Sequence, residues 1–165
     1  MGVKVKKIPL LDQPGYGDTY GFHRIYSNGY FHYRTFSKTP KLKFILAFKK
    51  DDLIGTGEFF KKTIFNFINT FKNWEEVEES ILKATSFLVT KADVNSKIEN
   101  LKEIVLSLRN TVANLSPKQI ERYQKIIDAV IQSDRLFFIE KPKNAYDPKF
   151  DDKILQQVYD RSEFW

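Results

Sequence analysis

The sequence contains no cysteine, and no apolar run in it approaches the roughly 20 residues that a membrane-spanning helix needs. The absence of cysteine excludes disulfides and thiolate-bound metals. The two histidines, His23 and His32, lack a second pair of ligands at helical spacing, so a zinc site is not expected. Because no apolar signal core follows Met1, we expect an intracellular, cytoplasmic protein without a transmembrane segment.

What the sequence does contain is enough apolar material for one folded domain. Apolar residues make up 42% and aromatic residues 15% of the 165 positions. The net charge is +6, but the lysines are scattered along the chain instead of forming one block. A scattered excess of Lys is typical of a solvated surface. RNA binding is therefore kept only as a minor alternative, in which aromatic side chains between Lys and Arg stack on bases.

Short apolar segments alternate along the chain with longer amphipathic ones. Four segments have the pattern of buried strands: Val3–Leu11, Lys41–Phe48, Ala84–Thr90 and Arg135–Glu140. Helices are expected at Phe22–Phe36, after Thr56, after Ser96, after Ser116 and at Asp151–Asp160. Only one helix is expected between the second and third strands, and the acidic stretch Glu75–Glu79 separates it from the third. This alternation predicts an α/β fold, with helices flanking a parallel sheet in a Rossmann-like three-layer sandwich.

Local signals set the expected starts and faces of these helices. Thr56 is the expected N-cap of the first helix after the second strand. The apolar stripe of that helix is expected to be core and consists of Phe60, Ile64, Phe67, Ile68 and Phe71. Ser96 with Glu99, and Ser116 with Gln119, each match a capping box, in which the two side chains satisfy amides at the start of a helix.

Two polar loops follow expected strands. Asp12-Gln13-Pro14-Gly15 follows the first strand, and Thr90-Lys91-Ala92-Asp93 closes the third. Ligands of parallel sheets bind outside the carboxyl ends of the strands, so both loops are candidates for a site. The Asp12 carboxylate is suited to hold Mg²⁺ through water, and the Gly15 amide is able to approach a terminal phosphate without interference from a Cβ atom.

The second loop has the chemistry of guanine recognition. The Asp93 carboxylate is able to accept two hydrogen bonds, from the imino and amino groups of guanine, while the stem of Lys91 lies along the base. Adenine offers no matching pair of donors, and a buried contact of this kind is worth about 1–3 kcal/mol against the wrong base. A simpler interpretation also stands, because such short patterns arise by chance and Asp-Gln-Pro-Gly is a good ordinary turn.

With both motifs in this order, the chain resembles the TRAFAC class of P-loop GTPases, especially the septin-like and immunity-associated branches. The resemblance covers Val3 to about Pro142. It implies the second half of a G domain at residues 1–143, followed by a C-terminal tail with a short helix at residues 144–165.

The resemblance also implies a set of site residues and cofactors. Asp12 and Gly15 correspond to the third guanine-nucleotide motif, with Asp12 as the residue nearest the metal. The fourth motif corresponds to Thr90, Lys91 and Asp93. The implied cofactors are GTP or GDP together with Mg²⁺.

The sequence departs from that family because it lacks a phosphate-binding loop. None of the seven glycines is followed by Lys, and Tyr16 stands after Gly15, so no Gln there orients an attacking water. GTP hydrolysis is therefore expected only if the missing half of the domain is supplied. We expect the remainder of a longer chain or a protein partner to supply it; otherwise the first two strands pair directly in a degenerate scaffold.

The principal alternative is a noncatalytic subunit of a larger assembly that keeps the scaffold and uses its surfaces for protein contacts. The aromatic residues between Tyr16 and Phe36 exceed what one amphipathic helix needs, and they are suited either to a partner interface or to a thick core contact. The tail Asn144–Trp165 is expected to be held in place by a partner or by the domain itself.

Overall fold

The computed structural model describes residues 30, 32, 34–39, 41–112, 115–141 and 152–165. The chain divides into two compact units, Met1–Pro40 and Lys41–Trp165. In the first unit the described residues 30, 32 and 34–38 are helical, as expected for the end of the predicted helix Phe22–Phe36. The predicted strand Val3–Leu11 and the loop with Asp12 and Gly15 lie outside the described residues, as does the predicted domain boundary at 143.

The second unit is built on a three-stranded parallel sheet. Its strands are β1 (Phe44–Lys49), β2 (Thr85–Ala92) and β3 (Leu136–Glu140), in the order β1-β2-β3. Leu46 lies opposite Phe87, and Leu88 lies opposite Phe137. The predicted strands in this part of the chain are confirmed, with ends that differ by a few residues. The predicted α/β class with a parallel sheet is confirmed as well.

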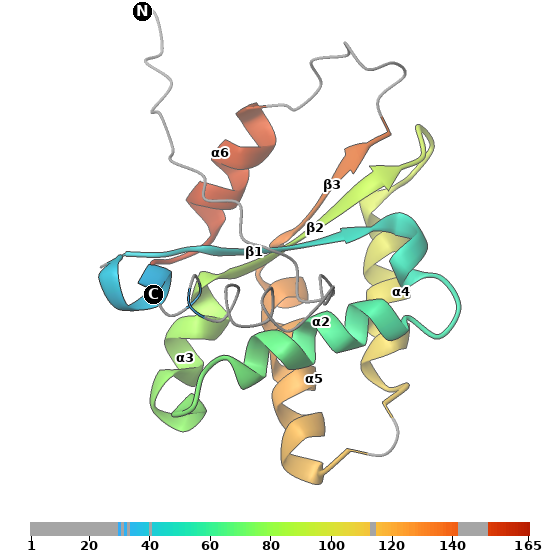
Figure 1. Ribbon diagram of the computed structural model, residues 1–165. Helices are drawn as coiled ribbons and strands as arrows, with labels where there is room; N and C mark the ends of the chain where they lie inside the picture. Colours follow the sequence, from blue (N-terminus) through green and yellow to red (C-terminus); the bar gives the residue numbers. More distant parts are fainter. Residues whose placement is uncertain (1–29, 31, 33, 40, 113–114, 142–151) are drawn as a thin grey trace, which may run out of the picture. The chain divides into compact units, whose positions relative to one another are not determined.

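Helices flank the sheet on both faces (Figure 1). Four of them lie on one side of the strands: α2 (Glu58–Asn69), α3 (Trp74–Ala84), α4 (Ile98–Arg109) and α5 (Pro117–Gln132). A short 3-10 helix, η1 (Lys50–Leu53), continues directly from β1. On the other side lies α6 (Asp152–Arg161). No helix of the described residues is both long and apolar enough to cross a membrane.

The face covered by four helices has an aromatic core. The ring of Phe60 on α2 lies 4.7 Å from that of Phe48 on β1 and 5.7 Å from that of Phe87 on β2. Tyr123 on α5 completes the group at 6.5 Å from Phe60. All five residues of the predicted apolar stripe are buried, which confirms the stripe as core, although Phe71 lies beyond the end of α2. Edge-on aromatic contacts add to the free energy of burying these rings.

The opposite face is packed by the C-terminal helix. Leu88 and Phe137 of the sheet form a buried cluster with Val158 of α6. Beyond the helix, Trp165 exchanges two backbone hydrogen bonds with Leu42, of 2.9 and 3.3 Å. The described part of the tail is thus held by the domain itself, one of the two arrangements expected from the sequence.

One helix between β1 and β2 was not predicted. The acidic stretch Glu75–Glu79 does not connect two elements but forms the first half of α3, whose apolar side buries Trp74 and Ile81. The acidic side chains face the basic side chains of α5, where Arg122 donates to Glu75 and Lys125 to Glu78. The run of acidic residues conceals the helical spacing of the buried side chains on α3.

The helix predicted after Thr56 begins one residue later than expected. Its N-cap is Gly57, in the left-handed conformation with φ 60° and ψ 30°, and no side chain caps it. A Cβ atom at Gly57 would lie 2.6 Å from Cδ2 of Leu108 on α4. Both the backbone angle and the close approach of α4 require glycine at this position, which is why Thr56 is not the cap.

The two predicted capping boxes have opposite outcomes. The box of Ser116 with Gln119 is confirmed, because the Ser116 hydroxyl accepts from the Gln119 amide and the Gln119 side chain accepts from the Ser116 amide. The box of Ser96 with Glu99 is wrong. There α4 has Lys97 as its N-cap and begins at Ile98, so Ser96 stands one residue too early to cap it.

Candidate functional site

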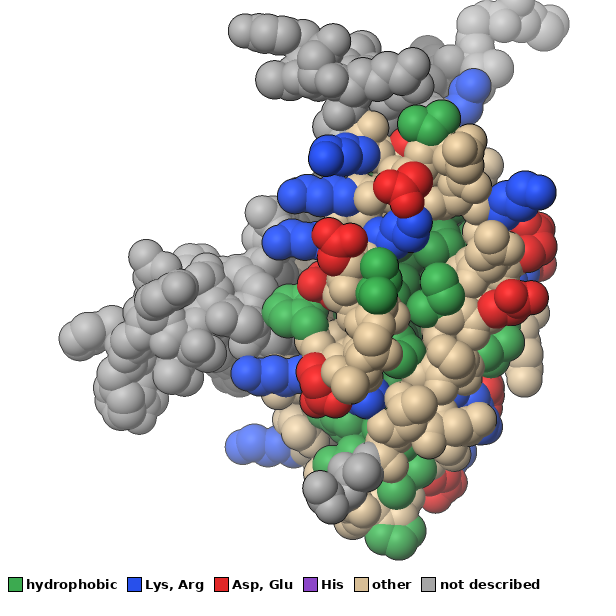
Figure 2. Space-filling model, turned by 90° about the vertical axis from the view of Figure 1, so that its right-hand side faces the viewer, with side chains coloured by type: hydrophobic (Ala, Val, Ile, Leu, Met, Phe, Trp, Pro, Cys, Tyr) green, Lys and Arg blue, Asp and Glu red, His purple; other side chains and the backbone are tan. Residues whose placement is uncertain are grey.

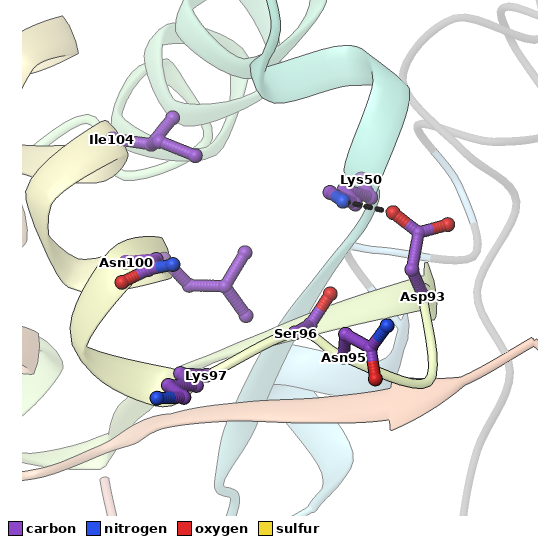
Figure 3. A pocket seen from close by; sticks show the side chains of 8 residues that line it. Lys50, Asp93, Asn95, Ser96, Lys97, Asn100 and Ile104 are labelled. Atoms are coloured by element: carbon purple, nitrogen blue, oxygen red, sulfur yellow. Dashed lines mark hydrogen bonds and ion pairs between the residues drawn. The ribbon is translucent and has the colours of Figure 1, made fainter.

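A hollow of about 260 Å³ opens at the carboxyl ends of β1 and β2 (Figure 3). Its walls come from the start of η1, from the turn after β2 and from the first half of α4. The residues that line it are Lys50, Asp93, Asn95, Ser96, Lys97, Asn100, Leu101 and Ile104. This is the position at which open α/β sheets bind ligands, since the strands end there and the following loops diverge.

The backbone is irregular at the end of β2, just before the loop that contains Asp93. Lys91 has φ 57°, in the left-handed region that a non-glycine residue rarely adopts. The pairing of β2 with β3 shifts register between Val89 and Ala92, and the Lys141 amide then donates to the Ala92 carbonyl at 2.8 Å. A left-handed residue costs about 1–2 kcal/mol, and such strain is concentrated at functional sites.

A tight turn connects this strand end to α4. The Ser96 amide donates to the Asp93 carbonyl at 2.8 Å, which closes the turn and brings both side chains to the hollow. Asp93 is paired with Lys50, the first residue of η1 (Figure 3). The side chain of Asp93 is 71% exposed and that of Lys50 is 24% exposed. Because its side chain is largely exposed, the Asp93 carboxylate is accessible to a ligand. The ion pair itself contributes little stability, since water screens it.

The remaining wall combines an apolar surface with polar groups. Leu101 and Ile104 on successive turns of α4 present aliphatic side chains, and Asn100 presents an amide beside them. The Ser96 hydroxyl points toward the space between the Lys50–Asp93 pair and the start of α4 (Figure 3). Its oxygen is buried and has no hydrogen-bond partner among the described residues. The hollow therefore offers a carboxylate acceptor, a hydroxyl, an amide and an apolar surface.

The five site residues predicted from the sequence have different positions in the structure. Asp93 lines the hollow. Thr90 does not, and its hydroxyl donates to the Phe48 carbonyl at 3.2 Å, which ties the end of β2 to the end of β1. Lys91 is exposed and lies outside the lining of the hollow. Asp12 and Gly15 lie outside the described residues.

The sequence did not single out Lys50, Asn95, Ser96 or Asn100 as site residues. The spacing of Ser96 to Glu99 predicts a helix cap instead. Lys50 and Ser96 lie in the loops that follow two predicted strands, so the rule that points to Asp93 also points to these loops. The sequence does not show that β1 pairs with β2, and this pairing is what places Lys50 beside Asp93.

No metal site is present in the part of the chain that the structure describes. No group of three or more His, Cys, Asp or Glu side chains there is arranged to hold an ion. The Mg²⁺ ligand implied by the GTPase resemblance is Asp12, which is not among the described residues.

No family model, curated protein or solved structure matches the chain.

Proposed function

We propose that the chain is a GTPase-related domain that binds the base of a guanine nucleotide in the hollow at the carboxyl ends of β1 and β2. One observation carries this proposal: Asp93, which stands in the Thr-Lys-x-Asp pattern, lies at this strand edge with an accessible carboxylate beside a hollow. A carboxylate has two oxygens that accept hydrogen bonds, and guanine presents two adjacent donors.

The size of the hollow supports a base and not a whole nucleotide. Sites that enclose complete small-molecule ligands have volumes of roughly 300–1,000 Å³. At about 260 Å³ the hollow is below that range. A planar base fits such a space, while the ribose and phosphates extend beyond it.

The residues that line the hollow are suited to a flat ring with polar edges, as in a nucleotide base. Ile104 offers an aliphatic side chain to a ring face, with the buried Leu101 behind it, and Asn100 offers a donor and an acceptor. Adenine has no pair of donors to match Asp93, and its exocyclic amine would stand where guanine has a carbonyl oxygen. We therefore expect guanine to bind in preference to adenine.

The phosphates and any Mg²⁺ are assigned to the part of the domain with Asp12 and Gly15 by the resemblance. No glycine in the sequence is followed by Lys, so a loop of the Gly-Lys-Ser/Thr type does not cradle the phosphates. The chain therefore binds without hydrolysing GTP unless a longer polypeptide or another chain supplies the missing half.

The test is a titration of the ¹⁵N-labelled protein with GMP, GDP, AMP and ADP, followed by NMR. A base contact alone gives weak binding, with a Kd on the order of 1 mM. We expect guanine nucleotides to bind at least about tenfold more tightly than adenine nucleotides, which corresponds to about 1.4 kcal/mol. Asp93→Asn replaces one acceptor oxygen by a donor, so it is expected to remove this preference.

Asp51→Asn is the matched control. Asp51 is an exposed aspartate in η1 at the same end of the sheet, but it does not line the hollow. Its loss is expected to leave both affinities unchanged. Equal affinity of the wild-type protein for GMP and AMP, or no saturable binding of either, would contradict the proposal.

A protein contact is the second candidate function, and exposed apolar side chains favour it. Ile54 and Val94 are 61% and 63% exposed, although apolar residues of this size are more often buried. Figure 2 shows apolar side chains at the surface on the side of the molecule with η1 and α4, between charged groups. Sedimentation velocity over a range of concentrations tests the simplest partner, a second copy. Ile54→Ser with Val94→Ser is expected to weaken any self-association, and a monomer at every concentration would contradict this form of the contact.

A further inference from the structure

Ser96 lines the hollow, and its hydroxyl has no hydrogen-bond partner among the described residues. We propose that Ser96 contacts the ligand directly and donates a hydrogen bond to a ring carbonyl that adjoins an N–H group. The ligand class is a lactam edge, in which N–H and C=O are neighbours, as in guanine and hypoxanthine. The proposal rests on the proposed function, because it places this edge against Asp93.

The first observation is the burial of an unpartnered hydroxyl. Among the described residues, the side-chain oxygens of Ser86 and Ser96 are buried without a hydrogen-bond partner. Buried polar groups in folded proteins are nearly always paired, so each exception calls for an explanation. Ser86 is fully buried within β2, whereas Ser96 lines the hollow. A ligand in the hollow is therefore able to reach Ser96 but not Ser86.

The second observation is that Ser96 does not cap the helix beside it. Its spacing to Glu99 matches a capping box, yet Lys97 is the N-cap of α4 and no side chain caps that end. The matching serine of α5, Ser116, does bond to the Gln119 amide. The hydroxyl of Ser96 thus contributes nothing to the start of α4 and remains available to a ligand.

The third observation is the position of Ser96 relative to Asp93. The bond from the Ser96 amide to the Asp93 carbonyl holds both residues in one turn, and both side chains line the same hollow. The carboxylate accepts hydrogen bonds only, whereas a hydroxyl is able to donate. Acceptor and donor held side by side match the N–H and C=O of a lactam edge.

The test compares three serine-to-alanine variants in two measurements: unfolding by denaturant without ligand, and affinity for GMP, IMP and AMP. Ser96→Ala is expected to keep the stability of the wild-type protein and to lose about tenfold in affinity for GMP and IMP. Ser86→Ala also removes a buried unpartnered hydroxyl, but it is expected to leave affinity unchanged. Ser116→Ala is expected to lower stability through the lost cap, also without a change in affinity.

Two results would overturn the inference while leaving the proposed function in place. One is an unchanged affinity of Ser96→Ala for GMP when Asp93→Asn has lost it. The other is a loss of stability in Ser96→Ala as large as in Ser116→Ala, since the hydroxyl would then have a partner inside the protein. Absence of GMP binding by the wild-type protein would overturn the proposed function, and this inference with it.

Discussion

The two ends of the parallel sheet differ in what surrounds their polar groups, although each has one buried hydroxyl without a partner, Ser86 at the amino end and Ser96 at the carboxyl end. At the amino end, the side chains of the buried Arg135 and of Lys43 donate hydrogen bonds to backbone carbonyls. The C-terminal Trp165 bonds to the backbone of Leu42, just before β1.

At the carboxyl end, the hollow is lined by the Ser96 hydroxyl and by the pair of Lys50 with the exposed Asp93, and Lys91 in the left-handed conformation precedes them outside the hollow. The side-chain bonds to backbone carbonyls are thus at one end and the hollow is at the other, and open α/β sheets bind their ligands outside the carboxyl ends of the strands.

Arg135 is the centre of the amino end. Its Nη1 atom donates to the carbonyls of Leu82, Lys83 and Thr85 at 2.6–2.8 Å, and Nη2 donates to Ala129 at 3.0 Å. Burial lowers the pKa of the guanidinium from its ordinary value, because the charged form loses hydration. The carbonyl oxygens compensate for that loss, so one side chain joins the end of α3, the start of β2 and α5.

Lys43, which precedes β1, also donates to backbone carbonyls. Its ammonium donates to the Tyr159 and Ser162 carbonyls at the end of α6 and lies 4.2 Å from the centre of the Tyr159 ring. A cation at a helix C-terminus is favoured by the helix dipole. Burial is the main cause that lowers the pKa of Lys43, and Asp160 and Glu163 oppose it.

The largest predicted effect is the loss of Arg135. Arg135→Met fills a similar volume but removes the hydrogen bonds to four backbone carbonyls, of which that of Thr85 is buried, and we expect a loss of about 3–4 kcal/mol in the free energy of unfolding. Equilibrium unfolding in urea measures this loss. Arg161→Met is the control, because Arg161 is exposed and donates to one carbonyl, of Asp134. An equal effect of the two variants would contradict the assignment of Arg135 as the centre of the amino end.

A smaller loss is predicted at the C-terminus. The Trp165 ring lies 5.7 Å from both Phe44 and Phe71, so Trp165→Ala is expected to lower the free energy of unfolding by about 2 kcal/mol. Phe164→Ala is the matched control, since Phe164 is exposed and is expected to matter less. If removal of Trp165 has no effect on thermal unfolding, the tail is not part of the amino-end structure.

Much of this structure follows from local sequence pattern, and what does not follow depends on contacts between distant segments. Burial is predicted by the apolar runs of the three strands and by the apolar stripe of α2, because strands and helices each have a characteristic spacing of buried apolar residues. The Ser116 box is predicted for the same reason. The start of α2 is not, since Gly57 is required by Leu108, which lies 51 positions away along the chain.

The site was predictable only in part. Asp93 stands in a short motif at a strand end, and both features are visible in the sequence. Lys50 becomes its neighbour only through the pairing of β1 with β2. Ser96 was assigned to a cap because its spacing to Glu99 is right, and only the actual start of α4 shows that its hydroxyl is not used there.

The smallest predicted effect lies away from both ends, on the outer side of the helices. Glu75 accepts from Lys118 and Arg122, and these bonds, the Lys118 bond first, lower its pKa from 4.5 to about 2. A carboxyl with a depressed pKa in the folded state stabilises the fold above pH 4.5, and this contribution is lost as the pH falls toward 2.

The variant Glu75→Gln tests this contribution. Its melting temperature is expected to lie below that of the wild-type protein at pH 6, and the difference is expected to shrink as the pH falls from 4.5 toward 2. The effect is small because the carboxylate is exposed to solvent. Glu103→Gln, an exposed glutamate on α4, is the control. A difference that stays constant over this pH range would show that the ion pairs do not stabilise the fold.

The central claim is that the carboxyl end of the sheet is the binding end. Chemical-shift mapping of the ¹⁵N-labelled protein with GMP tests it most directly. We predict that the amides of Lys50 and of residues 93–101 shift as GMP is added, that AMP leaves them nearly unchanged, and that Asp93→Asn abolishes the response. Shifts at Leu42, Arg135 and Trp165 instead, or the same response to both nucleotides, would contradict the claim.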